Sequence, residues 1–435
     1  MKNRFFKYVS QNILAMIGLS LYILADTYFI SKAVGANGIT ALNMALPVYG
    51  VIFALGQMVG VGSAIRYSIV KEQYRNSNKD GSNECDKYFS GALFWGLVIG
   101  VIFAVLGLVE IMGGDETIVA IGVPYFRIFM SFSPFFIFNY TCNAFVRNDG
   151  NPSVSMAATL ISSLFNIVFD YILMFPLGMG MPGAALATAL SPVVGVMICM
   201  IHFLSKKNTV KFKWFKTSLT RLFHCCQVGM SAFVGEMSGA VIVMVFNFII
   251  LRLTGNIGVA AYGVVANTAL VAVAVFNGVA LGSQPLISES YGKHNIKDIK
   301  LIEKLGVATA LGLAVIIVMM IWGFTDTIVG VFNSQGSDRL LSLARVGLRI
   351  YFIGFLFAGI NIFCSSALSA IASVKWAFVL SILKGFVVVN VCAAILAPIF
   401  GMNGVWVAFP LSEFILLIIS GFAMKKSIGA LESER

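Results

Sequence analysis

Apolar segments long enough to cross a lipid bilayer follow one another along almost the whole chain. A membrane-spanning helix needs about 20 mostly apolar residues. Twelve such segments, separated by short breaks that are polar or contain glycine and proline, are found at 12–33, 41–70, 88–112, 118–146, 155–177, 183–205, 224–252, 259–288, 302–325, 340–370, 376–400 and 404–424. Because lipid offers no hydrogen-bond partners to the backbone, such segments form helices. The sequence therefore predicts an all-α membrane protein with twelve transmembrane helices.

Lysine and arginine residues are concentrated in alternate loops, on one side of the predicted membrane. That side holds 22 of the 30, whereas the opposite side holds only Lys32, Arg252 and Arg339. Cytoplasmic loops are enriched in these two residue types. We therefore expect both termini in the cytoplasm of a bacterial-type inner membrane. The net charge of +11 follows membrane topology, and we expect no nucleic-acid partner.

The two halves of the chain are related by a weak internal repeat. Residues 38–63 align with 258–283, and both copies end in Gly-Ser; residues 180–191 align with 401–412 at nearly the same offset. An even number of predicted helices separates the copies, so both halves have the same orientation in the membrane. Two such bundles can rock around a cavity at their interface, which is the geometry of alternating access.

The repeat and the charge pattern together predict the domain organisation. We expect an N-terminal six-helix lobe at 1–205, a basic cytoplasmic linker at 206–223 and a C-terminal six-helix lobe at 224–435. The basic run in the linker indicates contact with anionic lipid head groups. We expect the chain to function as a monomer.

Four local motifs resemble those of the multidrug and toxic compound extrusion (MATE) family. They are LADTYFISKAVG at 24–35, FVRNDGNPSVSM at 145–156, FNIVFDYILMFPLGMGMPGAALAT at 165–188 and ALGSQPLISESYGKHN at 280–295. The resemblance covers nearly the whole chain. It implies a V-shaped pair of six-helix lobes and a secondary antiporter that exports organic cations or other amphiphiles in exchange for H⁺ or Na⁺. It also implies a distant kinship with lipid and polysaccharide flippases.

Four acidic residues lie well inside the apolar segments: Asp26, Asp170, Glu236 and Glu413. A carboxylate in the bilayer is unfavourable unless it is protonated, paired or facing water, so such acids are functional candidates by default. Asp26 is the strongest candidate. It lies about two-thirds along the first segment, where it is placed to take up and release a proton in each transport cycle. The structural alternative is a paired packing residue.

A second set of oxygen-bearing residues belongs to the fifth and sixth segments. Asn166 and Asp170 are four residues apart and share one helix face, and Thr188 follows the glycine- and proline-containing break that turns the chain back. Their oxygens suit a small cation, or a network that shares a proton with Asp26. In sodium-coupled members of the family, the matching positions form the cation site with the first-helix acid. The resemblance thus implies an H⁺ or Na⁺ site at Asp26, Asn166, Asp170 and Thr188; the alternative is a hydrogen-bonded core cluster.

Glu236 lies about one-third into the seventh segment, where many family members carry an acid. It is a candidate for binding a cationic substrate or a second coupling ion. The alternative is neutralisation by Lys384, Arg345 or Arg349. We expect Glu413 to pair with Lys384 in a structural role.

Other classes of protein fit the sequence less well. The chain has no nucleophile and base motif, and its three histidines lie near predicted cytoplasmic loops, so we do not expect an enzyme. Its seven cysteines have no metal-type or redox-type spacing, and we expect no cofactor besides the coupling ion. A related flippase of a lipid-linked precursor is the alternative function. It would favour a cationic cavity, whereas Asp26, Asp170 and Glu236 are acidic.

Overall fold

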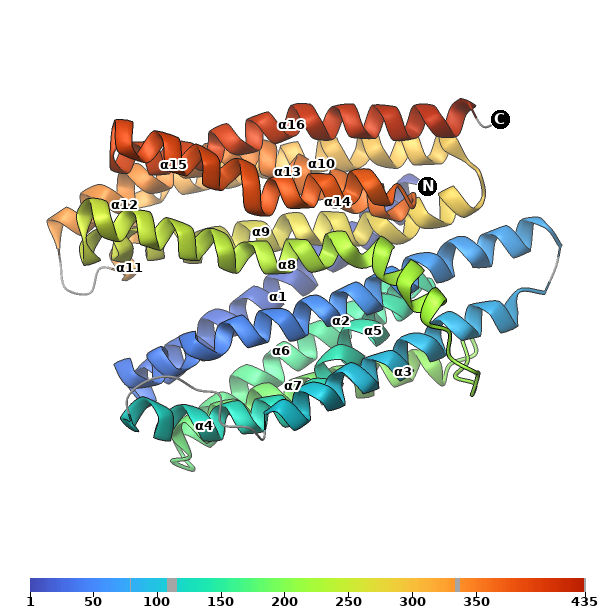
Figure 1. The fold of residues 1–435 in the computed structure, drawn as a ribbon, viewed down its shortest axis with the longest axis horizontal. Helices are drawn as coiled ribbons and strands as arrows, with labels where there is room; N and C mark the ends of the chain where they lie inside the picture. Colours follow the sequence, from blue (N-terminus) through green and yellow to red (C-terminus); the bar gives the residue numbers. More distant parts are fainter. Residues whose placement is uncertain (79, 108–115, 333–336, 434–435) are drawn as a thin grey trace.

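The computed structural model describes residues 1–78, 80–107, 116–332 and 337–433, and this part of the chain is almost entirely helical (Figure 1). Its first bundle contains α1 (Lys2–Ala33), α2 (Ala36–Asn76), α3 (Ser82–Leu106), α4 (Glu116–Ser131), α5 (Ser133–Asn148), α6 (Pro152–Met174) and α7 (Gly180–Phe203). Its second bundle contains α8 (Leu219–Thr254), α9 (Asn256–Gly292), α10 (Ile296–Gly323), α11 (Thr325–Phe332), α12 (Asp338–Tyr351), α13 (Phe355–Ala370), α14 (Val374–Ile382), α15 (Val388–Phe400) and α16 (Met402–Ser433).

The prediction of twelve membrane spans is confirmed within the described residues. Eleven continuous helical stretches are long and apolar enough to span, and the pair α4 and α5, bent by 47°, forms the twelfth. The bend lies at Pro134 in the first turn of α5, where proline cannot continue the hydrogen-bond ladder of α4. Two other spans contain short irregular turns, the 3₁₀ turn η1 (Phe352–Gly354) between α12 and α13 and the π turn η2 (Leu383–Val387) between α14 and α15.

Some predicted boundaries differ from the structure. The first helix begins at Lys2, ten residues before the predicted segment, because its early polar residues continue the helix beyond the apolar stretch. The short helix α11 occupies part of the stretch 326–339, which the sequence predicts as a loop. The third predicted segment ended at 112, and its last residues, 108–112, lie outside the described residues.

The helices run alternately between two faces of the molecule. One face, here called the linker face, carries the N-terminus, the C-terminal end of α16 and the connections 76–82, 148–152, 203–219, 292–296 and 370–374. The opposite face, here called the far face, carries the connections 33–36, 174–180, 254–256 and 400–402 and the short helix α11. The two bundles meet towards the linker face, and α1 and α8 diverge towards the far face (Figure 1). The predicted V-shaped arrangement of two lobes is therefore confirmed.

The hydrophobic cores follow this shape. In the far half of the molecule each lobe has its own core, built around Phe129 and Tyr49 in the first lobe and around Phe352 and Trp406 in the second. In the half near the linker face the cores are shared. Phe5 and Val9 of α1, for example, pack among residues of the second lobe. The two lobes are thus held together near the linker face and packed independently elsewhere.

Glycines of the internal repeat lie where the lobes approach most closely. Helix α2 packs on α8, and α1 packs on α9. A Cβ atom on Gly62 would lie 2.1 Å from the carbonyl oxygen of Cys225, and one on Gly282 would lie 2.7 Å from Cα of Val9. Gly62 and Gly282 are equivalent positions of the repeat. The shared Gly-Ser therefore marks two symmetry-related contacts at which backbones touch.

Candidate functional site

The structure brings the four predicted residues of the first lobe together from three helices. Asp26 lies on α1, Asn166 and Asp170 lie one turn apart on α6, and Thr188 lies on α7. Helix α6 packs against both α1 and α7. The exposed fraction is 8% for Asp26, 5% for Thr188 and 0% for Asn166 and Asp170. The four side chains therefore form one buried polar cluster, here called the Asp26 cluster.

Most acceptor oxygens of this cluster have no hydrogen-bond partner. The Asn166 Nδ2 group donates to the Thr188 Oγ1 atom at 3.3 Å. Among the residues that the structure describes, both carboxylate oxygens of Asp170, Oδ1 of Asp26 and Oδ1 of Asn166 are buried without a partner. Buried acceptors are normally satisfied in a folded protein, so each such atom needs an explanation. Four such oxygens in one cluster indicate a place for a cation or for a proton donor.

The two carboxyl groups are also close to each other. Asp26 and Asp170 lie near enough to interact directly. Two ionised carboxylates in a buried site repel each other and lose their hydration. A shared proton or a bound cation removes this conflict. The oxygens of Asp26, Asp170, Asn166 and Thr188 are of the hard type that small cations prefer, so the donor set fits Na⁺ as well as H⁺.

No larger metal site is seen in the described part of the chain. There, no three His, Cys, Asp or Glu side chains come together as metal ligands. The Asp26 cluster contains only two such residues, and its other two members offer an amide and a hydroxyl oxygen. This donor set offers only oxygen ligands and no nitrogen or sulfur, which suits a hard cation better than a soft transition metal.

Tyrosines that the sequence did not single out surround the cluster. Tyr125 of α4 acts electrostatically on both acids, and Tyr22 of α1 does so as well. The Tyr125 hydroxyl is hydrogen-bonded to the hydroxyl of Tyr49 on α2. These rings come together only when α1, α2 and α4 pack against one another in the folded protein. Their sequence signal, a tyrosine in an apolar segment, is too common to have identified them.

Glu236 faces the other lobe. Its Oε2 atom accepts a hydrogen bond of 2.9 Å from Nε2 of Gln57 on α2, and Tyr140 and Tyr22 of the first lobe lie within its electrostatic reach. Tyr22 is therefore close to Glu236 as well as to the two acids of the Asp26 cluster. An acid of the second lobe therefore lies at the interface, and Tyr22 of the first lobe is near both this acid and the Asp26 cluster.

None of the basic residues considered as partners forms an ion pair with Glu236 in the described part of the chain. Arg345 pairs with Asp326 near the far face at 2.7 Å. Lys384, in the π turn η2, lies within electrostatic reach of Glu413, but the two form no ion pair within 4 Å in the described structure. The carboxylate of Glu413 instead accepts a hydrogen bond of 2.7 Å from Asn361. Glu236 is therefore held by a neutral amide, within the residues that the structure describes.

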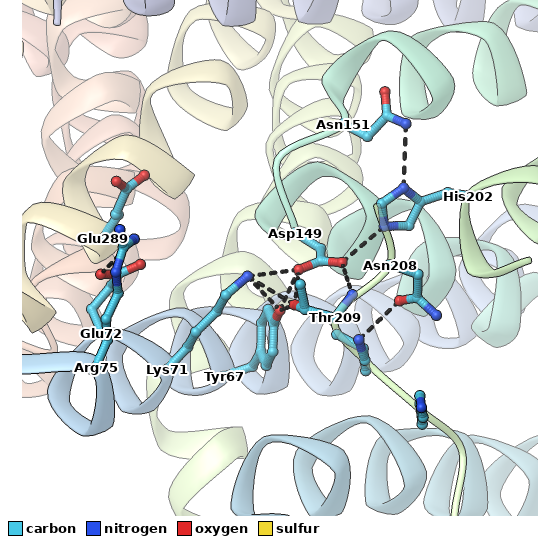
Figure 2. Close-up of polar contacts among 12 residues, drawn as sticks. Tyr67, Lys71, Glu72, Arg75, Asp149, Asn151, His202, Asn208, Thr209 and Glu289 are labelled. Carbon is cyan, nitrogen blue, oxygen red and sulfur yellow. Dashed lines mark hydrogen bonds and ion pairs between the residues drawn. The ribbon is translucent and has the colours of Figure 1, made fainter. Parts of the chain in front are cut away.

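Another buried acid, Asp149, lies near the linker face in a very different environment (Figure 2). Its carboxylate is fully buried and lies 2.7 Å from Nζ of Lys71 and 2.9 Å from Nε2 of His202. It accepts further hydrogen bonds from the Tyr67 hydroxyl at 2.5 Å and from the backbone amide of Thr209 at 2.9 Å. Burial alone would raise the pKa of Asp149, but the bonds from His202 and Lys71 outweigh burial and hold this pKa well below its usual range.

The contacts of Asp149 join four separate elements. The acid follows α5, and its partners lie on α2, at the end of α7 and at the start of the linker. The linker is therefore fastened to the first lobe by a buried charge. The motif FVRNDGNPSVSM contains this acid, but the sequence did not indicate that Lys71, His202 and Thr209 converge on it.

Ion pairs also connect the two lobes at the linker face. The Arg4 guanidinium binds both carboxylate oxygens of Glu289, at 2.7 and 3.2 Å. Nζ of Lys293 lies 3.7 Å from the carboxylate of Glu72 and also contacts Glu289. Figure 2 shows Glu289 beside Glu72 and Arg75 of α2. Charged contacts thus close the linker face, where the lobes are already packed through glycine.

Sequence comparisons identify the family. The family model described as MatE matches residues 12–172 and 232–399. Among curated relatives, the Multidrug export protein MepA of Staphylococcus saprophyticus is 25% identical over 396 residues, which is 88% of this chain and 85% of the relative. The protein of the same name in Staphylococcus aureus strain MRSA252 is 27% identical over 408 residues, with 90% and 86% coverage.

Solved structures share the fold. A structure described as the outward-facing conformation of a multidrug resistance MATE family transporter of the MOP superfamily superposes with a TM-score of 0.92 at 21% identity, covering 99% of this chain and 96% of that one. A MOP superfamily transporter from Pyrococcus furiosus, described as having a binding pocket of reverse polarity, gives 0.89 at 22% identity, covering 98% and 96%. With the family model matched in both halves, the chain belongs to the MatE family, the multidrug and toxic compound extrusion transporters of the membrane.

Proposed function

We propose that this chain is a secondary antiporter that exports organic cations or amphiphilic drugs in exchange for H⁺ or Na⁺. The observation that carries the proposal is the Asp26 cluster, with four buried acceptor oxygens that have no partner. Its members lie on α1, α6 and α7 of a lobe that meets a second lobe at a polar interface. Such an arrangement couples ion binding to lobe movement if the ion binds one lobe arrangement better than the other.

The coupling ion neutralises the Asp26 cluster. With both Asp26 and Asp170 ionised and nothing between them, the cluster is unfavourable, and a proton or Na⁺ removes the repulsion. Loading of the ion therefore changes the charge and the hydrogen bonding of α1, which also packs against α9 of the other lobe. Through this contact, ion binding at Asp26 changes the packing of α1 against the other lobe.

The substrate class follows from the charge of the interface. Glu236 provides a carboxylate that is held only by the amide of Gln57, and Tyr22 and Tyr140 lie close to it. Carboxylates and aromatic faces both attract organic cations. The relatives named multidrug export proteins support the same class of substrate. Glu236 is therefore the residue that we assign to a cationic substrate or to a second coupling ion.

The orientation follows from the charges of the two faces. Lysine and arginine gather on the linker face, and by the positive-inside rule that face lies in the cytoplasm. The protein would then reside in the cytoplasmic membrane of a bacterial cell, with both termini inside. The units 1–205 and 224–435 would act as the two moving lobes and 206–223 as their linker. Since one chain supplies both sides of the interface, it is sufficient as a monomer.

The alternative, a flippase of a lipid-linked precursor, is not favoured. Its pyrophosphate would require cations at the lobe interface. Glu236, an acid, lies at that interface instead, Asp26 and Asp170 are buried in the first lobe, and the curated relatives carry the name multidrug export protein.

The decisive experiment is dye efflux by the Asp26→Asn variant in inside-out vesicles, with proton and sodium gradients imposed separately. Asparagine keeps the shape of aspartate but has neither the negative charge nor the exchangeable proton. We expect coupled transport to fall to the background of empty vesicles, while expression and the thermal unfolding midpoint stay close to those of the wild type. The matched control is Thr27→Val, at the next, exposed position of α1, which should transport normally. Wild-type efflux by Asp26→Asn under either gradient would refute the assigned role.

A further inference from the structure

A cavity on the linker face lies apart from the Asp26 cluster. It has a volume of about 40 Å³ and is bounded by the first turns of α3, the linker residues 212–218 and the start of α8, with Ser63 of α2 at its base. Because α3 belongs to the first lobe and α8 to the second, the cavity lies at the seam between the lobes. Its volume has room for a small polar group such as a phosphate.

The wall of the cavity is cationic. Lys87, Lys213, Lys216 and Arg221 line it, and none of its lining residues is acidic. Two carboxylates lie nearby. Glu84 pairs with both Lys87 and Arg221, and Asp86 lies 2.8 Å from Lys213. Two acids for four cations leave a surplus of positive charge, and Lys216 has no carboxylate partner within the described residues.

Two hydrogen-bond donors in this region are unused. The Trp95 indole Nε1 atom, in the lining, and the Nε atom of Arg66 are both buried without a partner in the described part of the chain. Arg66 lies behind the cavity on α2, within electrostatic reach of the lining residues Tyr88 and Cys225. A buried donor without an acceptor is unfavourable by about 1–3 kcal/mol. The cavity therefore offers positive charge and free donors to an anionic acceptor.

The cavity extends along one face of α3. Lys87, Gly91 and Trp95 lie on one face of α3 at successive turns, so Trp95 is roughly 12 Å deeper than Lys87. Gly91 lines the cavity, and a Cβ atom there would meet no atom within 4 Å. Trp214 and Phe212, at the rim, are 84% and 48% exposed. Exposed aromatic rings beside basic residues are typical of the membrane–water interface.

We propose that this cavity binds the phosphate group of an anionic phospholipid from the leaflet at the linker face. Lys87, Lys216 and Arg221 hold the charge, the indole of Trp95 donates to an oxygen, and the exposed rings of the linker lie along the acyl chains. The surplus charge selects an anionic lipid over a zwitterionic one. Since Ser63 and Cys225 adjoin the close contact at Gly62, the bound lipid lies against the joint between the lobes.

The test measures lipid binding directly and does not depend on transport. The purified protein, delipidated in an uncharged detergent, is titrated with phosphatidylglycerol, with phosphatidylcholine of the same chains and with soluble glycerol 1-phosphate, and retained lipid is counted by native mass spectrometry. We expect one phosphatidylglycerol to bind at least tenfold more tightly than phosphatidylcholine. Equal binding of the two lipids would overturn the proposal. Binding of glycerol 1-phosphate as tight as that of phosphatidylglycerol would assign the cavity to a free phosphate and also overturn it.

Two kinds of variant locate the site. Lys87→Gln/Lys216→Gln removes charge, and Gly91→Leu fills the cavity without changing charge; each should weaken phosphatidylglycerol binding roughly tenfold or more. The matched controls are Lys206→Gln/Lys207→Gln, which removes two exposed linker charges outside the lining, and Gly312→Leu, which adds the same side chain at an open position of α10. Both controls should bind like the wild type. If controls and cavity variants lose binding equally, the linker attracts lipid only through its net charge, and the cavity is not a site.

Discussion

At the scale of single residues, the buried acids of this protein fall into two groups. Asp149 accepts hydrogen bonds or ion pairs from Lys71, His202, Tyr67 and Thr209. Asp170 is equally buried, yet neither of its carboxylate oxygens has a partner. An acid whose contacts are complete stabilises the fold, whereas one whose contacts are missing is available to a guest. Residue type alone does not reveal the difference, because both are aspartates of the first lobe.

The ligands of the Asp26 cluster distinguish the coupling ions. Sodium requires several oxygen ligands in fixed positions, so Thr188→Ala and Asn166→Ala should sharply weaken efflux driven by a sodium gradient. A proton requires only one basic carboxylate, so efflux driven by a proton gradient should tolerate Thr188→Ala far better than Asp26→Asn. Efflux of the two variants is measured under each gradient alone. If efflux by both variants proceeds at the wild-type rate under either the proton or the sodium gradient, Asn166 and Thr188 are packing residues.

The Asp149 contacts should contribute measurably to stability. In Asp149→Asn the charge is lost while Lys71 and His202 remain, and removing one partner of a buried pair typically lowers the free energy of unfolding by about 3–5 kcal/mol. Because the pKa of Asp149 is lower in the folded protein than in the unfolded chain, its stabilisation is fully present above about pH 4 and is lost as the pH falls further. Thermal unfolding in detergent at pH 7 should show the full loss. Glu84→Gln, in a partly exposed ion pair, is the control and should change the free energy by no more than about 1 kcal/mol.

At the scale of elements, the lobes meet through two helix pairs that the repeat makes equivalent. At Gly62 the backbone of α2 touches that of α8, and at Gly282 the backbone of α9 touches that of α1. Gly229 of α8 and Gly278 of α9 make further backbone contacts across the same two helix pairs, with Met58 and Ile13. These glycines together set how closely the lobes approach near the linker face.

Adding one methyl group at either glycine should destabilise the closed linker face. In Gly62→Ala and Gly282→Ala the new Cβ atom meets backbone atoms, which cannot rotate away. We expect each variant to lose about 1–3 kcal/mol of unfolding free energy, and the two losses to be similar because the contacts are related by symmetry. Gly50→Ala on α2 and Gly263→Ala on α9, with no atom near the added Cβ, are the controls and should be neutral or slightly stabilising. Equal midpoints for all four variants would contradict the close contact.

At the scale of the whole molecule, the loops separate into a basic linker face and a far face with few cations. The lobes are packed and ion-paired at the linker face and diverge towards the far face (Figure 1). In the proposed orientation, this arrangement is closed to the cytoplasm and open to the outside. Transport would then require Arg4 and Glu289, among others, to separate.

The orientation can be tested by cysteine labelling in intact cells, after the native cysteines are replaced. A cysteine at the exposed position Lys207 in the linker should resist a membrane-impermeant thiol reagent and react only after the cells are opened. A cysteine at Lys32, exposed near the far face, should react in intact cells. Labelling in the reverse order would place the linker face outside and refute the cytoplasmic assignment of both termini.

The sequence by itself determined the number of spans, the relation of the two halves and the candidate acids. Those features depend on local properties, namely the length of apolar runs, the parity of loop charges and the rarity of carboxylates in lipid. The α4 bend and the π turn at Leu383–Val387 escaped prediction, because both are interruptions inside continuous apolar segments.

Only the tertiary structure decided which polar groups meet. Spacing placed Asn166 and Asp170 on one helix face, but their proximity to Asp26, the contact of Gln57 with Glu236 and the bonds that surround Asp149 join residues far apart in the chain. Glu236 was weighed against three basic partners in the sequence, and the fold put an amide there instead. Pairing between distant helices depends on how whole bundles pack, and no local pattern encodes that packing.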